Sequence, residues 1–169
     1  MTAVRIGAVV AGVLGVLCTV APAVAQTGRP MPTFHTSVVS AHIQPGGKAR
    51  LRLRVELPEG LHVQSDKPRD PALVPTSLTF SKDGPVSVLR TTYPKATDLA
   101  QPGLDEPLAV FSGTFDIDVE VSVSPTARPG ALEIPGQLRY QSCTAEVCFP
   151  PARAALTWHV KVGAATAAR

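Results

Sequence analysis

The sequence predicts an all-β fold, an immunoglobulin-like antiparallel β-sandwich. Apolar and polar residues alternate with a period of two in almost every segment after residue 33, and no segment longer than a turn has the period of a helix. Clusters of proline and glycine separate these segments, so the chain divides into about eight or nine short strands joined by turns. A length of 169 residues suits one domain with its own core rather than two.

Residues 1–25 have the pattern of a secretory signal peptide. Arg5 gives the positive start, residues 6–20 are almost all apolar, and Ala23-Val24-Ala25 is a small-x-small cleavage site before Gln26. The apolar run is too short for a comfortable membrane span and no other stretch comes near one, although an uncleaved amino-terminal anchor stays an alternative. We therefore expect a periplasmic or secreted protein with no membrane span after cleavage, in a compartment where disulfides persist.

The charge pattern argues against one class of function. The chain has 16 Lys and Arg residues and 13 Asp and Glu residues, which gives a formal net charge of +3. The basic residues are scattered rather than clustered, so the sequence gives no indication of nucleic-acid binding.

The first part of the domain is expected to form two paired strands. Residues 26–33 contain a glycine and two prolines and read as a flexible leader before a domain at 34–163. Residues 34–43 form the first expected strand. Residues 48–57 form the clearest one, with five apolar residues on one side and five charged residues on the other, as in a half-buried strand with a wet outer face. Anion binding by its three arginines is the alternative use of that face.

Proline and glycine set the limits of the later segments. The prolines of residues 65–75 keep this crossing out of a sheet interior, and residues 94–107 form the longest irregular piece, either a functional loop or a plain connector. The last strand puts Trp158 on its apolar face, where we expect it in the core. The remaining expected strands are 61–64, 76–80, 86–93, 108–111, 113–123, 131–142 and 152–162, followed by a short tail at 164–169.

Cys143 and Cys148 form a C-x4-C pair just before Pro150-Pro151, whereas Cys18 lies in the expected signal peptide. A bridge that closes so short a loop stabilises a fold by about 2 kcal/mol, against roughly 4 for one that spans most of a domain. The pair is therefore poorly placed as a structural crosslink and well placed for thiol–disulfide exchange, because exposed bridges are readily reduced. Spacing alone leaves both interpretations open, and it does not fit a four-ligand zinc site.

Several motifs occur together in this chain, and the most specific combines a tyrosine, both cysteines and two prolines, in that order, on a predicted hairpin. The motifs are Gly60-Leu61-His62, the crossing from Lys67-Pro68 to Pro75-Thr76, Pro107-Leu108-Ala109-Val110-Phe111, and Tyr140-Gln141-x-Cys143-x4-Cys148-x-Pro150-Pro151. Together they resemble the amino-terminal periplasmic domain of the thiol:disulfide interchange protein DsbD. This resemblance covers most of the chain after residue 25. It implies an immunoglobulin-like fold whose cysteine pair accepts electrons from a thioredoxin-like partner and passes them to exported proteins.

The resemblance also implies roles for single residues. Cys148 would form the mixed disulfide with the incoming partner, and Cys143 would resolve it. The loop before Leu108 matches the family's cap over the cysteines, while the positions beside the pair, where we expect aromatic residues in many relatives, hold histidine and glutamine here. The candidate pocket and cap residues are His62, Gln64, Leu104, Leu108, Tyr140 and Phe149.

Two other functions stay open. One is a non-catalytic binding or assembly domain with a structural disulfide, and the other is copper handling by Cys143, Cys148 and His62, since two thiolates and an imidazole suit a soft metal. The relay function needs no cofactor. Its expected partners are a thioredoxin-like redox protein or a membrane thiol–disulfide transporter as donor, and exported thiol proteins as recipients. We expect the reductant to come from a separate protein, because no segment resembles a thioredoxin-like or membrane domain.

Overall fold

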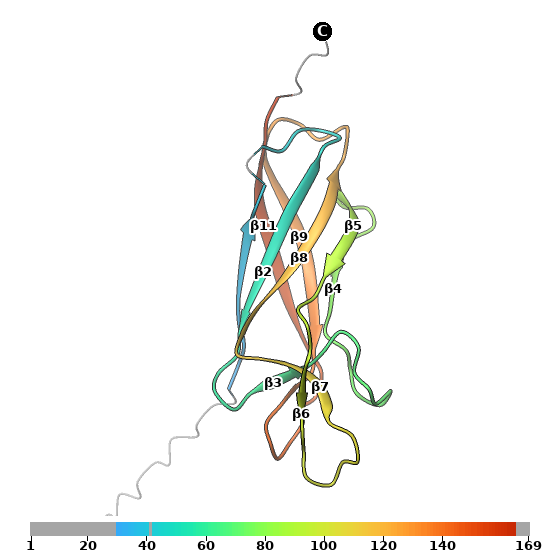
Figure 1. The fold of residues 1–169 in the computed structure, drawn as a ribbon. Coiled ribbons are helices and arrows are strands. Elements are labelled where there is room, and N and C mark those ends of the chain that lie inside the picture. The colour runs from blue at the N-terminus through green and yellow to red at the C-terminus, as the bar shows by residue number, and fades with distance from the viewer. Residues whose placement is uncertain (1–29, 41, 165–169) are drawn as a thin grey trace, which may run out of the picture.

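The computed structural model describes residues 30–40 and 42–164, and every regular element among them is a β-strand (Figure 1). The expected signal peptide and Cys18 lie outside the described residues. No helix in the described part of the chain is long and apolar enough to cross a membrane. The strands are β1 (Thr33–Val38), β2 (Lys48–Glu56), β3 (His62–Gln64), β4 (Ser77–Phe80), β5 (Val86–Thr92), β6 (Thr97–Leu99), β7 (Leu108–Ser112), β8 (Thr114–Val123), β9 (Gly130–Tyr140), β10 (Ser142–Cys143) and β11 (Ala152–Val162).

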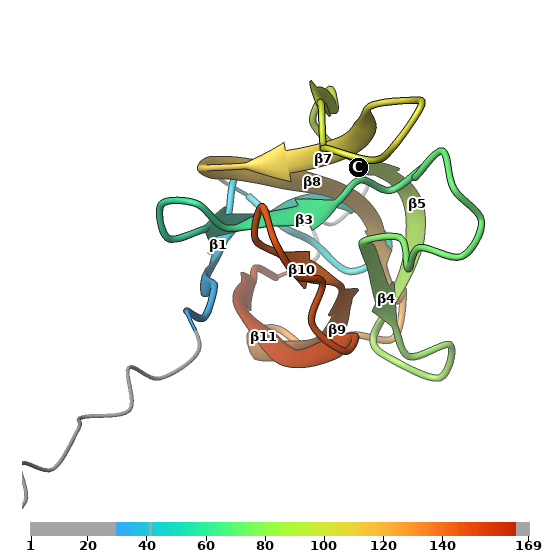
Figure 2. The same ribbon diagram turned by 90° about the horizontal axis from the view of Figure 1, so that it is seen from below.

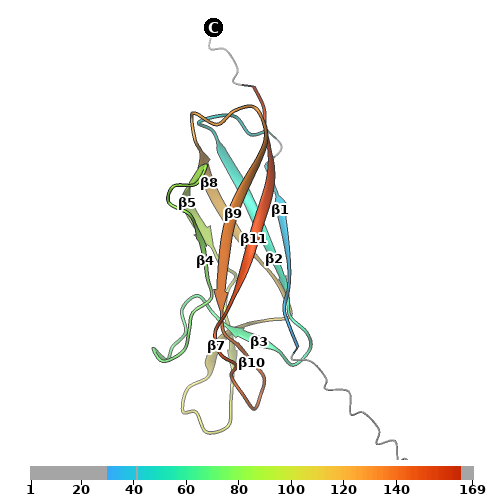
Figure 3. The same cartoon turned by 180° about the vertical axis from the view of Figure 1, so that it is seen from behind.

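The strands form two long sheets and one small sheet, with antiparallel pairing between all neighbouring strands. The long sheets have the orders β1-β2-β8-β5 and β11-β9-β4, and the small sheet has the order β10-β3-β7-β6. The long sheets pack face to face, and the small sheet lies at one end of this sandwich (Figures 1 and 3). The predicted all-β sandwich is confirmed.

The core lies between the two long sheets and follows the predicted alternation. The inward residues of β2 and β8, such as Leu53 and Ile117, are fully buried against Ile134 and Trp158 of the facing sheet. The Trp158 indole N–H donates to the carbonyl of Arg52 at 2.9 Å, so this polar group is satisfied inside the core. The expected core position of Trp158 is therefore confirmed.

The charged outer face of β2 is paired with an acidic row on β8. The strand register places Arg52 opposite Asp118 and Arg54 opposite Asp116, and each arginine donates two hydrogen bonds to the carboxylate it faces. Lys48 contacts Glu120 at 2.9 Å. Arg52, Arg54 and Lys48 thus pair with acidic side chains of β8. The face is therefore a solvated row of ion pairs rather than an anion site.

Three segments differ from the sequence prediction by more than one residue at a strand end. The first strand ends at Val38, because the Arg50 N–H of β2 then donates to the Ser40 hydroxyl rather than to a backbone carbonyl, and Ile43 forms an isolated bridge with Val162 of β11. The expected loop at 94–107 contains β6, a three-residue strand on β7 that is too short to produce a readable alternation. The expected strand at 131–142 splits after Tyr140, because β9 pairs with β4 whereas β10 pairs with β3 of the small sheet.

A single glycine turns the chain from the small sheet into the long one. Gly113 separates β7 from β8 and has a φ of 63°, a conformation that other residues adopt only with strain. Its carbonyl accepts a hydrogen bond from the Leu57 N–H at 3.0 Å, which fixes the end of β2 beside this junction. This junction therefore connects the small sheet directly to both β2 and β8 of the sandwich.

Substituting Gly136 is expected to disrupt the Trp158 packing. A Cβ at this β9 position would lie 2.8 Å from Trp158 Cζ3 and 3.2 Å from Phe80 Cε1, both in the packed interior. We expect Gly136→Ala to lower the free energy of unfolding by about 1–3 kcal/mol, measured by urea denaturation. Gly163→Ala is the control, because its new Cβ would meet only the Ile43 carbonyl oxygen at 3.6 Å. Equal stability of the two variants would show that the Trp158 ring shifts to accommodate the new methyl group without lowering the free energy of unfolding.

Asp118 is expected to contribute to stability above the acid range. Hydrogen bonding to Arg52, with its charge and that of Arg50, holds the pKa of Asp118 below its ordinary value. A carboxyl whose folded pKa is depressed stabilises the fold above its unfolded pKa and loses this effect as the pH falls through the folded pKa. Asp118→Asn should therefore lose less stability than wild type between neutral pH and the acid range, measured by urea unfolding at each pH. The exposed Asp105→Asn is the control and should follow the wild-type curve.

Candidate functional site: the Cys143–Cys148 hairpin

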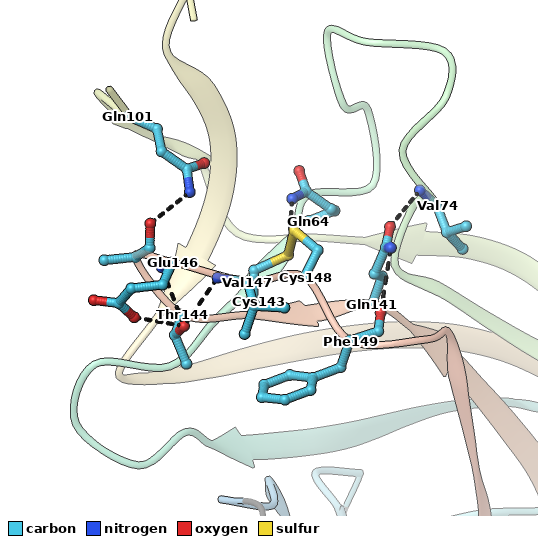
Figure 4. Close-up of a disulfide and its surroundings, with 11 residues drawn as sticks. Gln64, Val74, Gln101, Gln141, Cys143, Thr144, Glu146, Val147, Cys148 and Phe149 are labelled. Atoms are coloured by element: carbon cyan, nitrogen blue, oxygen red, sulfur yellow. Dashed lines mark hydrogen bonds between the residues drawn. A yellow bond between two sulfur atoms is a disulfide. The ribbon is translucent and has the colours of Figure 1, made fainter. Parts of the chain in front are cut away.

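A disulfide joins Cys143 and Cys148 across a tight turn at the end of the small sheet (Figure 4). The turn is closed by hydrogen bonds from Thr144 N–H to the Val147 carbonyl at 2.8 Å and from Phe149 N–H to the Ser142 carbonyl at 2.9 Å. The Thr144 hydroxyl oxygen also accepts bonds from the N–H groups of Glu146 and Val147. The sequence between the cysteines therefore folds as a stable local loop.

The two cysteines differ in exposure. Cys143 belongs to β10, pairs with His62 of β3 and is fully buried. Cys148 lies on the outer arm of the turn and is exposed. The next residues include the exposed Pro150 and Pro151, which lack N–H donors. This arm can therefore form few backbone hydrogen bonds with a further strand. This difference in residue exposure favours Cys148 over Cys143 as the cysteine that a thiolate from solvent would attack.

His62 and Gln64 lie beside the disulfide, as the sequence predicted. Directly opposite residues of an antiparallel pair share one face of the sheet, so His62, Gln64 and Cys143 point to the same side of the small sheet. Val63 points to the opposite side and belongs to the sandwich core. The Gln64 side chain is fully buried and donates from Nε2 to Cys143 Sγ at 3.6 Å (Figure 4).

His62 is buried, and desolvation lowers its pKa, so the imidazole is neutral near pH 7. Its Nε2 atom has no hydrogen-bond partner within the described part of the chain. Leu61, Leu99 and Val110 line a pocket of about 580 Å³ together with His62. The described residues hold no group of three or more His, Cys, Asp or Glu side chains suited to a metal ion, so the structure gives no support to the copper hypothesis.

The remaining candidates occupy different environments. Tyr140 lies in the core with its ring 5.6 Å from that of Phe34. Phe149 is half-buried against the core. Val147, on the other side of Cys148 in the sequence, has an exposed apolar side chain. Leu104 is 51% exposed in the loop between β6 and β7, and Leu108 is buried opposite Leu99.

Two glutamines that were not among the candidates tie the hairpin to neighbouring segments (Figure 4). Gln101, in the loop before β7, donates to the Ala145 carbonyl at 2.8 Å. Gln141 donates to the Phe149 carbonyl at 3.3 Å and accepts from the Val74 N–H at 3.0 Å. Gln141 was part of the cysteine motif, but no sequence signal identified Gln101, because a single glutamine in a loop has no pattern.

Residues 28–157 match the family described as the N-terminal domain of the thiol:disulfide interchange protein DsbD. The chain belongs to this family. It is therefore a DsbD N-terminal-like domain, and the family resemblance drawn from the sequence is confirmed. The family and the cysteine pair at disulfide distance together support a thiol–disulfide interchange domain.

Solved structures are similar to this DsbD N-terminal-like domain at low sequence identity. The N-terminal periplasmic domain of ScsB from Proteus mirabilis has a TM-score of 0.53 and 15% identity, over 75% of this chain and 45% of that one. The reduced DsbD N-terminal domain of Neisseria meningitidis has a TM-score of 0.46 and 12% identity, over 66% of this chain and 77% of that one. No curated protein matches the sequence. The ScsB similarity supports the fold alone.

The exposure difference predicts which thiol reacts first. In the reduced, folded protein, iodoacetamide should alkylate Cys148 about tenfold faster than Cys143, because only Cys148 is open to solvent. Peptide mass spectrometry at a series of reaction times measures both rates. In urea the two rates should become similar, which is the control for intrinsic reactivity. Faster labelling of Cys143 in the folded protein would contradict the assignment.

Proposed function

We propose that this domain is a periplasmic thiol–disulfide relay, which takes reducing equivalents from a thioredoxin-like donor or a membrane thiol–disulfide transporter and passes them to exported thiol proteins. One observation carries the proposal: in a domain of this family, one cysteine of the pair is exposed on a turn while the other is fully buried in a sheet. Such a pair has one sulfur that a partner can reach and a second thiol held ready within the same hairpin.

The reduction of the domain then follows in two steps. A partner thiolate attacks Cys148 Sγ, a new bond forms between those sulfurs, and the Cys143–Cys148 bond breaks with its electron pair passing to Cys143 Sγ. The partner's second thiol loses a proton and attacks the partner sulfur of this mixed disulfide, which releases the Cys148 thiolate. Two protons end on the two domain thiols, and the partner leaves as a disulfide. Transfer to a recipient disulfide runs the same exchange in reverse.

The predicted signal peptide supports a periplasmic location, because export would bring the pair into a compartment where such a bridge is stable. Val147 supports a docking role for the hairpin tip, since an exposed apolar side chain directly beside the reactive sulfur favours contact with a partner surface. Phe149, in contrast, is half-buried and packs against the core.

The reduction potential of the bridge tests the proposal. Equilibration with a thioredoxin or glutathione couple should give a value well above about −300 mV, the region in which structural disulfides of secreted proteins lie. Mass spectrometry after acid quenching measures the two redox forms. A bridge that stays closed in folded protein under a large excess of reduced thioredoxin would leave only the structural role of a binding or assembly domain.

Single-cysteine variants test the order of attack. Cys143→Ser keeps the exposed Cys148 and should form a mixed disulfide with a thioredoxin-like donor that lacks its resolving cysteine. Cys148→Ser leaves only the buried thiol of the pair and should trap little or none. Non-reducing gel electrophoresis measures the trapped complex. Equal trapping by both variants would contradict the assigned order.

A further inference from the structure

We infer that Gln64 is a positioning residue for disulfide exchange: its side-chain amide holds Cys143 Sγ as the leaving sulfur when Cys148 is attacked. This inference rests on the proposed function for its biological use, but its chemistry concerns the disulfide itself. The family resemblance implied only a position beside the pair for this glutamine and no chemical role.

The contact between the amide and the sulfur is fully enclosed. Gln64 and Cys143 are each 0% exposed, and Nε2 donates to Sγ at 3.6 Å from the neighbouring strand (Figure 4). Water does not compete for this contact, so the hydrogen bond is stronger than the same pair would be at a surface. A fully buried glutamine is also uncommon, because burial of an amide is unfavourable unless its polar atoms are used.

Hydrogen bonds on both sides fix the backbone that carries the Gln64 side chain. Its N–H donates to the Gln141 carbonyl at 3.1 Å, and its own carbonyl accepts from the Thr76 hydroxyl at 2.5 Å. The Ser65 N–H donates to the Ala109 carbonyl at 2.9 Å. The strand that carries Gln64 is therefore fixed from both sides, as Figure 2 shows for β3 between β10 and β7. The amide is positioned before any partner arrives.

The exchange step creates charge at the sulfur that Gln64 contacts. Attack of a partner thiolate on Cys148 Sγ breaks the bond to Cys143 and leaves the electron pair on Cys143 Sγ as a thiolate. A thiolate in a buried site is unfavourable without a donor or a cation. The imidazole opposite it, His62, is neutral and buried, so it brings no positive charge. The amide N–H is a donor already directed at this atom.

The oxygen atom of the Gln64 amide should also affect the equilibrium between the disulfide and the dithiol. Gln64 Oε1 is buried and has no hydrogen-bond partner among the described residues while the disulfide is closed. A disulfide sulfur cannot donate a hydrogen bond, whereas a thiol can. After reduction, rotation of the amide lets the Cys143 S–H donate to Oε1. The closed bridge therefore carries an unsatisfied acceptor that the dithiol satisfies, which favours the reduced form.

Gln64→Leu and Gln64→Met test the inference, because both keep the volume and remove the amide. Three readouts apply: the rate of reduction by dithiothreitol, the equilibrium with glutathione, and the pH titration of the Cys143 ¹³Cβ NMR shift in reduced protein. We expect reduction to slow about tenfold and the glutathione equilibrium to move about tenfold toward the disulfide. The pKa of the Cys143 thiol should rise, because the thiolate loses its donor.

Gln101→Leu is the matched control. This glutamine also donates to the hairpin, but to the Ala145 carbonyl and not to sulfur, so its loss should leave all three readouts at wild-type values. Wild-type values in a folded Gln64→Leu or Gln64→Met variant overturn the inference. The dithiothreitol rate and the thiol titration need no protein partner. A wild-type domain that fails with thioredoxin but shows these amide effects would refute the relay function and leave the inference standing.

Discussion

The pairing of β10 with β3 is the constraint on which the site depends. It covers only two residue pairs, Ser142 with Val63 and Cys143 with His62. This short ladder holds one cysteine inside the small sheet and leaves the other on the turn, so it creates the difference between the two sulfurs. The pairing is stable because the other face of β3 packs against the sandwich core. Val63 and Phe111 belong to the sandwich core, and the Phe111 ring lies 5.0 Å from that of Phe115 on β8. Core packing therefore positions the buried sulfur of the pair.

Strand β3 of the small sheet is buried on both faces, which explains what the sequence could and could not predict for it. Residues 61–64 alternate apolar and polar as Leu-His-Val-Gln, a pattern typical of a strand with one wet face. All four are buried, since the polar face meets the cysteine hairpin and the pocket instead of water. The places where local sequence rules fail are often functional sites, and here the failure coincides with the disulfide.

The long strands could be predicted because their alternation runs over many residues. The expected limits for β2, β8 and β11 agree with the structure to within one residue, and each of these strands has an unbroken apolar face in the core. Short elements could not be predicted in this way. Three-residue β6 has no period to read, and only tertiary pairing shows that the segment at 131–142 serves two sheets. Tyr140 marked the family motif, and its ring belongs to the sandwich core, a position that the motif alone did not indicate.

Three glutamines from separate segments contact the hairpin, and the chemistry of the one at the sulfur suits the proposed relay, in which the pair both takes and gives electrons. Gln64 contacts the buried sulfur, Gln101 the turn, and Gln141 the exit of the hairpin. A carboxylate at the sulfur would oppose the thiolate and trap the disulfide, and a cation there would lower the thiol pKa and trap the dithiolate. An amide carries no charge and offers both a donor and an acceptor. The neutral Gln64 amide can therefore donate to the buried sulfur of the disulfide and accept from the buried thiol after reduction, which suits the proposed relay.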